Sequence, residues 1–240
     1  MKEVRYFYVP EAPSFQELPE DEAQHAIRVL RLGVGDEVML MDGKGTFYRA
    51  EITDARKKRC RYRIVEAQPQ SRQWSGHLHL AMAPTKNMDR TEWLAEKATE
   101  IGFDELTFLR CQFSERTVLK EERIDKILIS AMKQSRKAEK PQLNGITDFK
   151  EFVERDFMGG KYICHCYEQS DLLSKQLLKT LLKSGEDALV LIGPEGDFSI
   201  DEVRLAEQNG FVPVTLGQSR LRTETAALVA VYLMHLMNEL

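Results

Sequence analysis

Two short loops late in the chain carry the residues best suited to binding chemistry. "GPEG" (193–196) follows the apolar run 188–192, and "LGQSRLRTE" (216–224) follows the apolar run 211–215. In open α/β sheets, ligands bind just beyond the carboxyl ends of such strands. Both loops are rich in backbone amides and poor in lysine, whereas a diphosphate needs positive charge or a nest of several glycines. We therefore predict a pocket for a neutral adenine-like ring with an amino-acid tail.

Other reactive residue types are explained more simply as parts of strands. The "CHC" segment (164–166) lacks a second pair of zinc ligands, and alternation along a strand separates His165 from the two cysteines. His77 and His79 alternate at the start of another apolar strand and are interpreted in the same way. "GQSRL" lacks the second glycine of a nucleophile elbow. No metal is predicted, and hydrolysis has no support.

The elements that must position the two loops alternate along the second part of the chain. Predicted strands cover 77–83, 105–109, 161–167, 187–193 and 211–217, and predicted helices cover 89–102 and 121–139. Strands that alternate with helices imply a mostly parallel sheet covered on both faces. Ser199 and Glu202 form a capping box for a further helix.

The first part of the chain reads as a smaller, mainly β module. Strands are predicted at 4–9, within 36–55 on both sides of a glycine turn, and at 60–67, with a helix at 20–32. Short strands around one helix suggest a barrel-like fold, and the polar stretch 68–76 reads as a linker. The expected domains are 1–70 and 74–240.

The last predicted helix, 223–239, is apolar on nearly all sides. Thr223 is its expected N-cap, and Glu224 in the first turn faces the positive end of the helix dipole. Such a helix must be buried in its own domain and against something else, most simply a second copy of the chain. The sequence therefore predicts a homodimer, with a wholly internal core helix as the alternative.

Composition is that of an ordinary globular protein, with 42% hydrophobic and 30% charged residues. No apolar run is long enough to span a membrane, and four irregularly spaced cysteines suggest no disulfide framework, so a cytoplasmic location is expected. The net charge is −4, yet "ARKKRCRYR" (55–63) is strongly basic. This cluster is either a solvated edge strand or a phosphate-contacting stripe, with Tyr62 packing or stacking.

The two loops, read together as "LIGPEGDFS" and "LGQSRLRTETAAL", resemble the RsmE family of 16S ribosomal RNA (uracil-N3) methyltransferases in the SPOUT superfamily. The resemblance extends to "HAIRVLRLGVGDEV" (25–38), "KNMDRTEWLAEKATEIGFDEL" (86–106), "SERTV" (114–118) and "AMKQSRK" (131–137). It implies an N-terminal PUA-like RNA-binding β-barrel and a C-terminal SPOUT domain, an α/β fold with a parallel sheet and a deep trefoil knot. It also implies S-adenosylmethionine as cofactor and 16S ribosomal RNA within the 30S subunit as partner.

The resemblance further implies which residues form the site. Cofactor contacts are expected from Glu168, Ile192, Gly193, Pro194, Glu195, Gly196, Leu216, Gly217, Ser219, Leu221, Arg222, Thr223, Glu224 and Thr225. Arg220 and Arg222 are expected to steady the uracil oxygens or a phosphate, and Glu224 and Glu195 are the nearest candidate bases, with a structural role favoured for both glutamates. Candidate RNA contacts are Arg28, Arg31, Arg56, Lys57, Lys58, Arg59 and Lys86.

Three positions depart from the family pattern. Asp197 stands where a third glycine is usual, Ser219 where an arginine is usual, and Lys133 where a glutamate is common. The competing hypotheses are a SPOUT methyltransferase for another ribosomal or transfer RNA position, a non-catalytic ribosome-assembly protein, and a nucleotide-binding oxidoreductase. The intact cofactor loops argue against a pure binding module.

Overall fold

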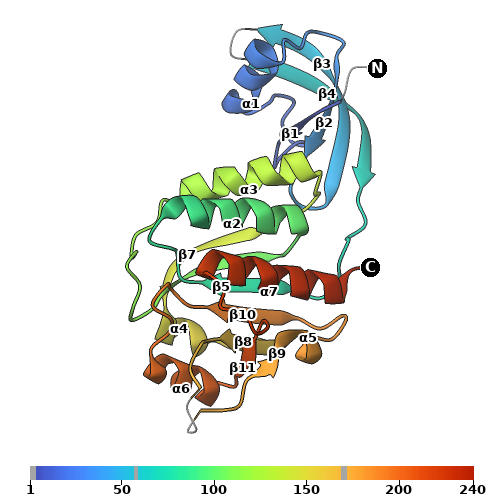
Figure 1. Ribbon diagram of the computed structural model, residues 1–240. Helices are drawn as coiled ribbons and strands as arrows, with labels where there is room; N and C mark the ends of the chain where they lie inside the picture. The colour runs from blue at the N-terminus through green and yellow to red at the C-terminus, as the bar shows by residue number, and fades with distance from the viewer. Residues whose placement is uncertain (1–3, 57–58, 169–171) are drawn as a thin grey trace. The chain divides into compact units, whose positions relative to one another are not determined.

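The computed structural model describes residues 4–56, 59–168 and 172–240. The chain forms two compact units (Figure 1). Unit 1 comprises Met1–Arg72 together with Ile129–Lys140, and unit 2 comprises Gln73–Leu128 together with Pro141–Leu240. Among the described residues, none of the helices has the length and apolar character that crossing a membrane requires.

Unit 1 contains a four-stranded sheet in the order β1-β2-β3-β4. Its strands are β1 (Arg5–Tyr8), β2 (Glu37–Met41), β3 (Thr46–Arg56) and β4 (Arg59–Pro69). β1 pairs parallel with β2, and the other pairs are antiparallel. The predicted glycine turn joins β2 to β3, where Gly43 and Gly45 have φ values of 72° and 102° that disfavour other residues.

The predicted helix 20–32 is wrong in its extent. An α-helical turn, α1 (Glu20–Gln24), passes into a π-helical turn, η1 (His25–Val29), and the segment leaves helical geometry after Leu30. Arg31 then adopts a φ of 54°. The apolar spacing fixed the buried face correctly, since Ala23 and Ala26 are fully buried, but it carries no signal for the wider π turn.

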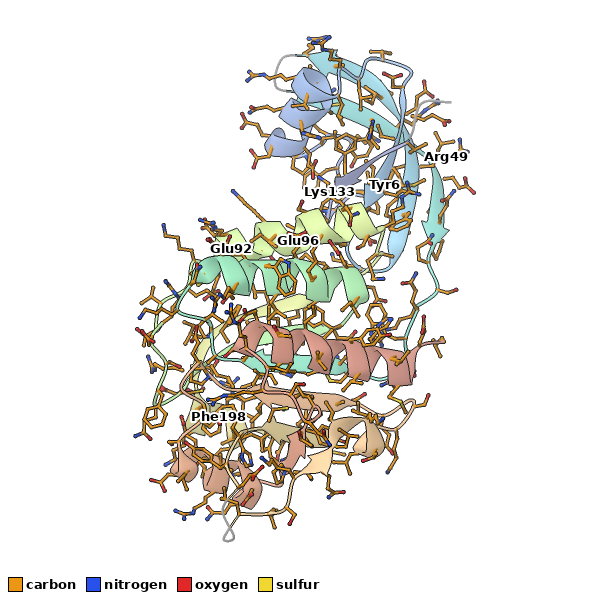
Figure 2. All side chains as sticks on the ribbon, viewed as in Figure 1. Tyr6, Arg49, Glu92, Glu96, Lys133 and Phe198 are labelled. Atoms are coloured by element: carbon orange, nitrogen blue, oxygen red, sulfur yellow. The ribbon has the colours of Figure 1, made fainter. Side chains whose placement is uncertain are left out.

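Unit 1 also includes the end of helix α3 (Glu121–Ser135), which stops short of the predicted residue 139 because Arg136 turns to a φ of 55°. Lys133, labelled in Figure 2, donates to Glu22 Oε1 at 2.6 Å, and Glu22 Oε1 also accepts from the Tyr8 backbone N–H at 3.2 Å. The lysine that departs from the family pattern therefore has its own acidic partner in this chain.

Unit 2 is built on a seven-stranded parallel sheet in the order β7-β6-β5-β10-β8-β11-β9. The strands are β5 (Leu78–Met82), β6 (Glu105–Arg110), β7 (Gln142–Asp148), β8 (Gly160–Cys164), β9 (Gln176–Leu177), β10 (Ala188–Ile192) and β11 (Val212–Thr215). The helices besides α3 are α2 (Met88–Ile101), α4 (Phe149–Val153), α5 (Leu178–Leu181), α6 (Ile200–Gln208) and α7 (Thr223–Asn238). The predicted parallel α/β sheet is confirmed; β7, β9 and α4 were not predicted, and the trefoil knot stays a prediction.

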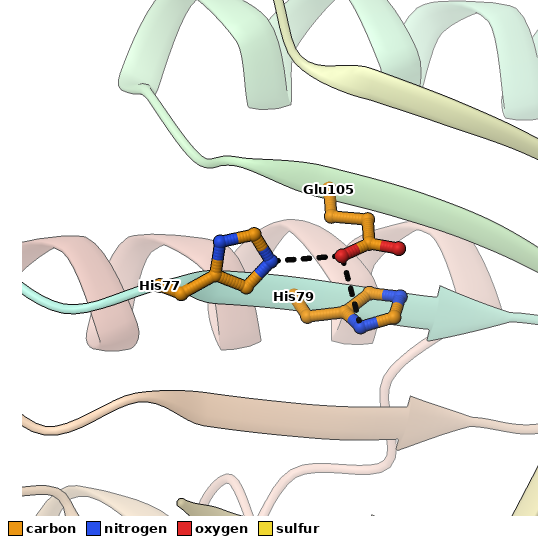
Figure 3. Close-up of side chains that lie close together, drawn as sticks. All are labelled: His77, His79 and Glu105. Atoms are coloured by element: carbon orange, nitrogen blue, oxygen red, sulfur yellow. Dashed lines mark hydrogen bonds and ion pairs between the residues drawn. The ribbon is translucent and has the colours of Figure 1, made fainter. Parts of the chain in front are cut away.

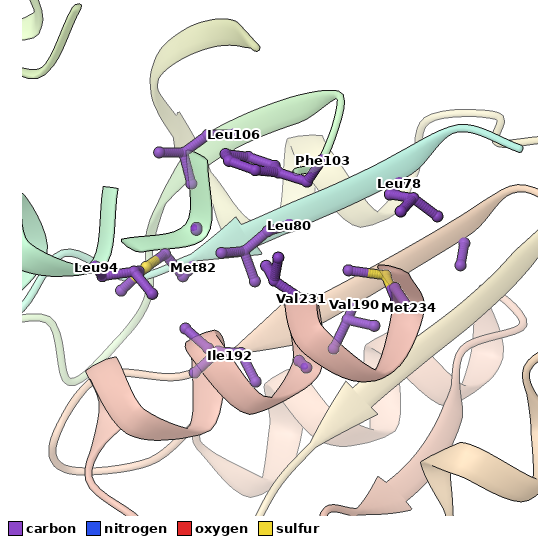
Figure 4. Packing of buried hydrophobic residues seen from close by; sticks show 14 of the residues in the cluster. Leu78, Leu80, Met82, Leu94, Phe103, Leu106, Val190, Ile192, Val231 and Met234 are labelled. Carbon is purple, nitrogen blue, oxygen red and sulfur yellow. The ribbon is translucent and has the colours of Figure 1, made fainter. Parts of the chain in front are cut away.

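Side chains that alternate along β5 and β10 build a core on each face of this sheet. On one face, Leu78, Leu80 and Met82 pack with Val190 and residues of α2 and α7 (Figure 4). On the other face, Ala81, Leu189 and Leu191 pack with residues of α4 and α6. Strands covered on both faces explain why their sequences are continuous apolar runs.

The predicted linker 68–76 is only partly a linker. β4 continues to Pro69, and Trp74 is 4% exposed within the core of unit 2. Its indole N–H donates to Asp104 Oδ2 at 3.0 Å. A large aromatic residue in a polar stretch was the signal that the chain is anchored here.

Helix α7 begins at Thr223 with Arg222 as its N-cap, so the predicted N-cap, Thr223, is wrong by one residue. Val231 and Met234 are fully buried in the chain's own core, whereas Tyr232 and Leu236 are 50% and 47% exposed. One side of this apolar helix therefore packs within unit 2, and the other side meets solvent in the single chain.

We predict that Met234→Ala lowers the free energy of unfolding by about 2–5 kcal/mol, because a fully buried side chain leaves a cavity. Met158→Ala is the matched control: Met158 is 87% exposed, so its change stays within about 0.5 kcal/mol. Urea denaturation followed by circular dichroism measures both. Equal effects of the two substitutions would contradict the packing described for α7.

Candidate active site

A pocket of about 510 Å³ opens beyond the carboxyl ends of β8, β10 and β11. Residues 192–197, from the last residue of β10 onward, line one side, and 214–223 except Gln218 line the other. Cys164, His165 and Cys166 at the end of β8 complete it, with Arg90 and Ala226 from α2 and α7. Because these strands run parallel, their carboxyl ends meet at one edge of the sheet.

The loop from β10 to α6 packs closely against neighbouring residues at two of its glycines. A Cβ atom on Gly193 would lie 3.0 Å from the Phe198 backbone nitrogen, and one on Gly196 would lie 3.2 Å from Phe113 Cβ. The predicted capping box is confirmed, with the Glu202 N–H donating to Ser199 Oγ and the Ser199 N–H donating to Glu202 Oε2. The helix start is thereby fixed directly after the loop.

The backbone conformation and hydrogen bonds of Asp197 explain why an aspartate fits where the family usually has a glycine. Its φ is 69°, a left-handed conformation that glycine adopts freely and that aspartate tolerates better than most residues. Asp197 Oδ1 accepts from the Phe198 N–H and Oδ2 accepts from the Cys166 N–H, both at 2.8 Å. The aspartate therefore keeps the backbone shape of a glycine and adds a tether to the loop after β8.

Two further carboxylates of the same segment hold neighbouring loops in the same way. Glu195 Oε1 accepts from the Lys86 N–H, after β5, at 2.9 Å. Glu202 Oε1 accepts from the Gln112 N–H, after β6, at 2.8 Å. Arg116 reinforces the first tether by donating to the Lys86 carbonyl oxygen at 2.7 Å. The bond made by Glu195 supports a positioning role for this candidate base.

The end of β8 differs from the strand predicted over 161–167. The strand ends at Cys164, so His165 and Cys166 lie in the following loop and line the pocket. His165 is 7% exposed, and neither ring nitrogen has a hydrogen-bond partner among the described residues. Burial, helped by Lys175, lowers the pKa of His165, so the ring is neutral near pH 7. Periodicity alone did not reveal that a buried, unpaired imidazole faces this pocket.

Glu224 is also buried, at 7% exposure, in the first turn of α7. Its Oε1 lies 3.7 Å from Arg90 Nε, while Oε2 has no hydrogen-bond partner among the described residues. A buried carboxylate oxygen without a donor is costly and indicates a place where a ligand donor fits.

Arg220 and Arg222 have exposed side chains on the pocket rim. Within the described part of the chain, neither guanidinium makes a hydrogen bond or ion pair. The Arg222 carbonyl accepts from the Ala226 N–H at 2.8 Å and so caps α7 through the backbone. The side chain of Arg222 is therefore available to a bound substrate without disturbing the helix start.

The structure brings most of the predicted cofactor residues together around this pocket. They are Ile192, Gly193, Pro194, Glu195, Gly196, Leu216, Gly217, Ser219, Leu221, Arg222 and Thr223. Glu168, Glu224 and Thr225 are not among the lining residues, and Glu168 is exposed next to residues outside the described ones. The pocket is also lined by residues that were not predicted from the sequence: Arg90, Cys164, His165, Cys166, Asp197, Val214, Thr215 and Ala226.

The candidate RNA contacts lie in both units. Arg28, Arg31, Arg56 and Arg59 are exposed in unit 1, Lys86 is exposed in unit 2, and Lys57 and Lys58 lie outside the described residues. On β4, Arg59, Arg61 and Arg63 alternate with the buried Cys60 and Tyr62.

Tyr62 cannot stack on a base, because its ring is 1% exposed and its hydroxyl donates to the Ala12 carbonyl oxygen at 3.0 Å. Glu17 lies 2.8 Å from Arg59 and 3.5 Å from Arg61, so part of the basic charge is already balanced. The edge-strand and phosphate-contact interpretations therefore both fit β4.

We predict that Asp197→Gly is more stable than Asp197→Ala by about 1 kcal/mol. Both variants lose the same hydrogen bonds, so the difference isolates the left-handed backbone. Asp201 in the first turn of α6 is the matched control, and there the order reverses because alanine favours a helix over glycine. Urea denaturation of the four variants measures both differences; an alanine variant at 197 as stable as the glycine variant would show that φ does not constrain this position.

Comparison with known proteins agrees with this geometry. A model of the RNA methyltransferase domain matches residues 72–235, and a model of the RNA methyltransferase PUA domain matches residues 18–65. Ribosomal RNA small subunit methyltransferase E of Bacillus subtilis is 29% identical over 97% of this chain and 93% of that protein. The protein of the same name from Synechocystis is 31% identical over 85% of this chain and 67% of that protein.

Solved structures agree as well. A probable rRNA-methyltransferase from Porphyromonas gingivalis is 40% identical, with a TM-score of 0.91 and 98% of each chain covered. The ribosomal RNA small subunit methyltransferase E of Neisseria gonorrhoeae, solved bound to S-adenosyl methionine, is 26% identical, with a TM-score of 0.79 and 95% of each chain covered. The chain thus belongs to the RNA methyltransferase family, among the relatives named ribosomal RNA small subunit methyltransferase E.

Proposed function

We propose that this protein uses S-adenosylmethionine to methylate N3 of a uridine in 16S ribosomal RNA of the small ribosomal subunit. The observation that carries the proposal is the pocket formed by the two motif loops at the carboxyl ends of β10 and β11, in a chain of the RNA methyltransferase family. Relatives that bear the name ribosomal RNA small subunit methyltransferase E align with nearly the whole chain. These relatives support the choice of ribosomal RNA as substrate.

The residues of the pocket fit S-adenosylmethionine. A volume of about 510 Å³ lies within the roughly 300–1,000 Å³ of small-molecule sites. The loops 192–197 and 216–223 would hold the cofactor largely through backbone groups, and the unpaired acceptor at Glu224 Oε2 next to the pocket suits its amino or hydroxyl donors. When bound, the cofactor supplies an electrophilic methyl group on a positively charged sulfur. Glu195 and Asp197 line the pocket and would contribute negative charge that favours a bound cation.

Uracil chemistry assigns roles to the charged side chains around the pocket. N3 bears a weakly acidic imide proton, and its loss places negative charge on the two ring oxygens. Arg222 and Arg220, both exposed on the rim, can donate to those oxygens or to a flanking phosphate. Glu195 and Glu224 are the candidate acceptors of the proton, and the contacts of Glu195 with the Lys86 N–H and of Glu224 with Arg90 favour a structural role for both. Catalysis would consist mostly of positioning and charge stabilisation.

N3 lies on the Watson–Crick edge, so the target base must be unpaired or turned out of its helix to reach the pocket. The surrounding RNA then needs contacts elsewhere on the protein. Arg28, Arg31, Arg56 and Arg59 in unit 1 and Lys86 beside the pocket are exposed cations suited to phosphates. With a 30S particle as substrate, we also infer a cytoplasmic location for the protein.

We predict that Arg222→Ala lowers the methylation rate by roughly 10²–10³-fold, the usual loss for one donor to a developing oxyanion. Cofactor affinity stays nearly unchanged, because the Arg222 backbone, which caps α7, survives removal of the side chain. Arg222→Lys restores the rate only in part, since lysine keeps the charge but loses the planar fork. Calorimetry with S-adenosylmethionine and single-turnover methylation of 30S particles measure the two quantities.

Arg155→Ala is the matched control for this test, because Arg155 follows α4 and is absent from the pocket lining. A wild-type rate in the Arg222→Ala variant rules out the catalytic role. Lost cofactor affinity would instead assign Arg222 to the structure of the loop. Mass mapping of 16S ribosomal RNA from cells with and without the protein tests the function itself, and a methyl group elsewhere than N3 of a uridine overturns it.

We further infer that the active protein is a homodimer. Trp93 of α2 and Tyr232 and Leu236 of α7 are each more than 40% exposed, and these two helices pack against each other. Exposed apolar side chains that gather on one helix pair are typical of a protein–protein interface. Val231 and Met234 lie in the chain's own core, so charged substitutions there test the fold rather than the dimer.

We predict that Leu236→Glu produces monomers that remain folded, because a charge at a half-exposed position disrupts an apolar interface more than the core. Val118→Glu, at a 74% exposed position before α3, is the control and leaves the oligomeric state unchanged. Light scattering after gel filtration measures the mass, and circular dichroism checks the fold. A wild-type mass near that of one 27.7 kDa chain at micromolar concentration contradicts the dimer.

A further inference from the structure

Three metal-ligating side chains converge at the edge of the sheet opposite the pocket (Figure 3). His79 on β5 and Glu105 on β6 are direct partners in the parallel register, and His77 precedes β5 on the same face. One ligand atom from each residue lies within 4.8 Å of the other two. His77 Nε2 is 2.8 Å and His79 Nδ1 is 3.6 Å from Glu105 Oε2.

A second layer of contacts orients these side chains. The far nitrogen of His79, Nε2, lies 2.8 Å from Thr107 Oγ1, and Asn144 Nδ2 donates to Glu105 Oε1 at 2.6 Å and to Thr107 Oγ1 at 2.8 Å. Metal-bound histidines usually donate their second N–H to a neighbouring oxygen, and metal-bound carboxylates are usually hydrogen-bonded as well. The Nε2–H tautomer of His79, donating to Thr107, directs the Nδ1 lone pair toward Glu105.

The surroundings favour a cation at this point. The His79 side chain is 7% exposed, so its ring is shielded from bulk water. Asp187 accepts from the His77 N–H and Asp104 accepts from the Leu78 N–H, so two more carboxylates stand beside the site. The His77 side chain is 39% exposed, which gives an ion a path from solvent.

From this geometry we propose a binding site for a divalent transition-metal ion, Zn²⁺, whose protein ligands are His77, His79 and Glu105. Two imidazoles and one carboxylate form a known three-ligand zinc set, which leaves a coordination position for water. Ligands about 2.0–2.2 Å from a tetrahedral zinc lie roughly 3.3–3.5 Å apart. The separation of 3.6 Å between His79 Nδ1 and Glu105 Oε2 is too long for a hydrogen bond but close to this value.

The site is separate from the proposed methyl transfer. His79 pairs with Leu189 at the start of β10, whereas the pocket begins at Ile192, about 10 Å further along the strand. A bound ion would cross-link β5 to β6 at this edge. No metal was predicted from the sequence, because histidines at 77 and 79 fit an ordinary strand and the pairing of His79 with Glu105 depends on the neighbouring strand.

The test is calorimetric titration of ZnCl₂ into the full-length, tag-free chain after dialysis against a chelator. We expect one Zn²⁺ per chain. His77→Gln and Glu105→Gln each weaken binding by at least about 100-fold, because each removes a ligand. Asn144→Ala weakens it by about 10–100-fold, as is usual for an outer-shell partner. His25→Gln, the control for an exposed imidazole in unit 1, leaves the affinity unchanged.

Circular dichroism of the metal-free variants shows whether a variant that binds zinc more weakly is still folded. His77 is the most informative position, because its side chain is the most exposed of the three. Cobalt(II) supplies a second measurement, since ligation by nitrogen and oxygen gives visible bands without a thiolate charge-transfer band. Equal zinc affinity of the wild type and His77→Gln, or no binding by the wild type, overturns the proposal. A thiolate band overturns it as well, by placing the ion on cysteine. S-adenosylmethionine affinity, measured with and without zinc, should not change, so this test and that of the proposed function fail independently.

Discussion

The segment from the end of β10 to the first turn of α6 is held by carboxylates that accept hydrogen bonds from the backbone of three other loops. Glu195 binds the Lys86 N–H after β5, Asp197 binds the Cys166 N–H after β8, and Glu202 binds the Gln112 N–H after β6. A bond from a backbone N–H to an ionised oxygen is shorter and stronger than one between neutral groups. The parallel register makes this possible, because it brings the carboxyl ends of all four strands to one edge. The shape of the pocket therefore depends on these acidic side chains as much as on its own lining.

The glycines that line the pocket and the charged side chains at its rim have different roles. Gly193 and Gly196 line the pocket, and neither leaves room for a Cβ atom without displacing Phe198 or Phe113. The side chains that can meet a substrate lie at the rim, where Arg220 and Arg222 are exposed.

Much of the fold could be predicted from the sequence, because it depends on local signals. These signals are the continuous apolar runs, the Ser199–Glu202 capping box and the glycine turn before β3. The π turn at His25–Val29 and the end of β8 at Cys164 could not, since both depend on how the segments pack rather than on their own period. The second error placed His165 on a strand instead of in the pocket. Contacts between distant parts of the sequence could not be predicted for the same reason. His79 lies next to Glu105 only because β5 and β6 are neighbours in the sheet.

Unit 1 is discontinuous in sequence, and this has an evolutionary consequence. Its contacts include Ile129–Lys140 as well as the first 72 residues, and Met132 from the later segment is fully buried with Met41 and Phe47. A gene fragment that encodes only the N-terminal part would lack this cover and leave apolar side chains open to water. Recombination that exchanges the N-terminal module as one contiguous block is therefore disfavoured, and the two units are expected to be inherited together.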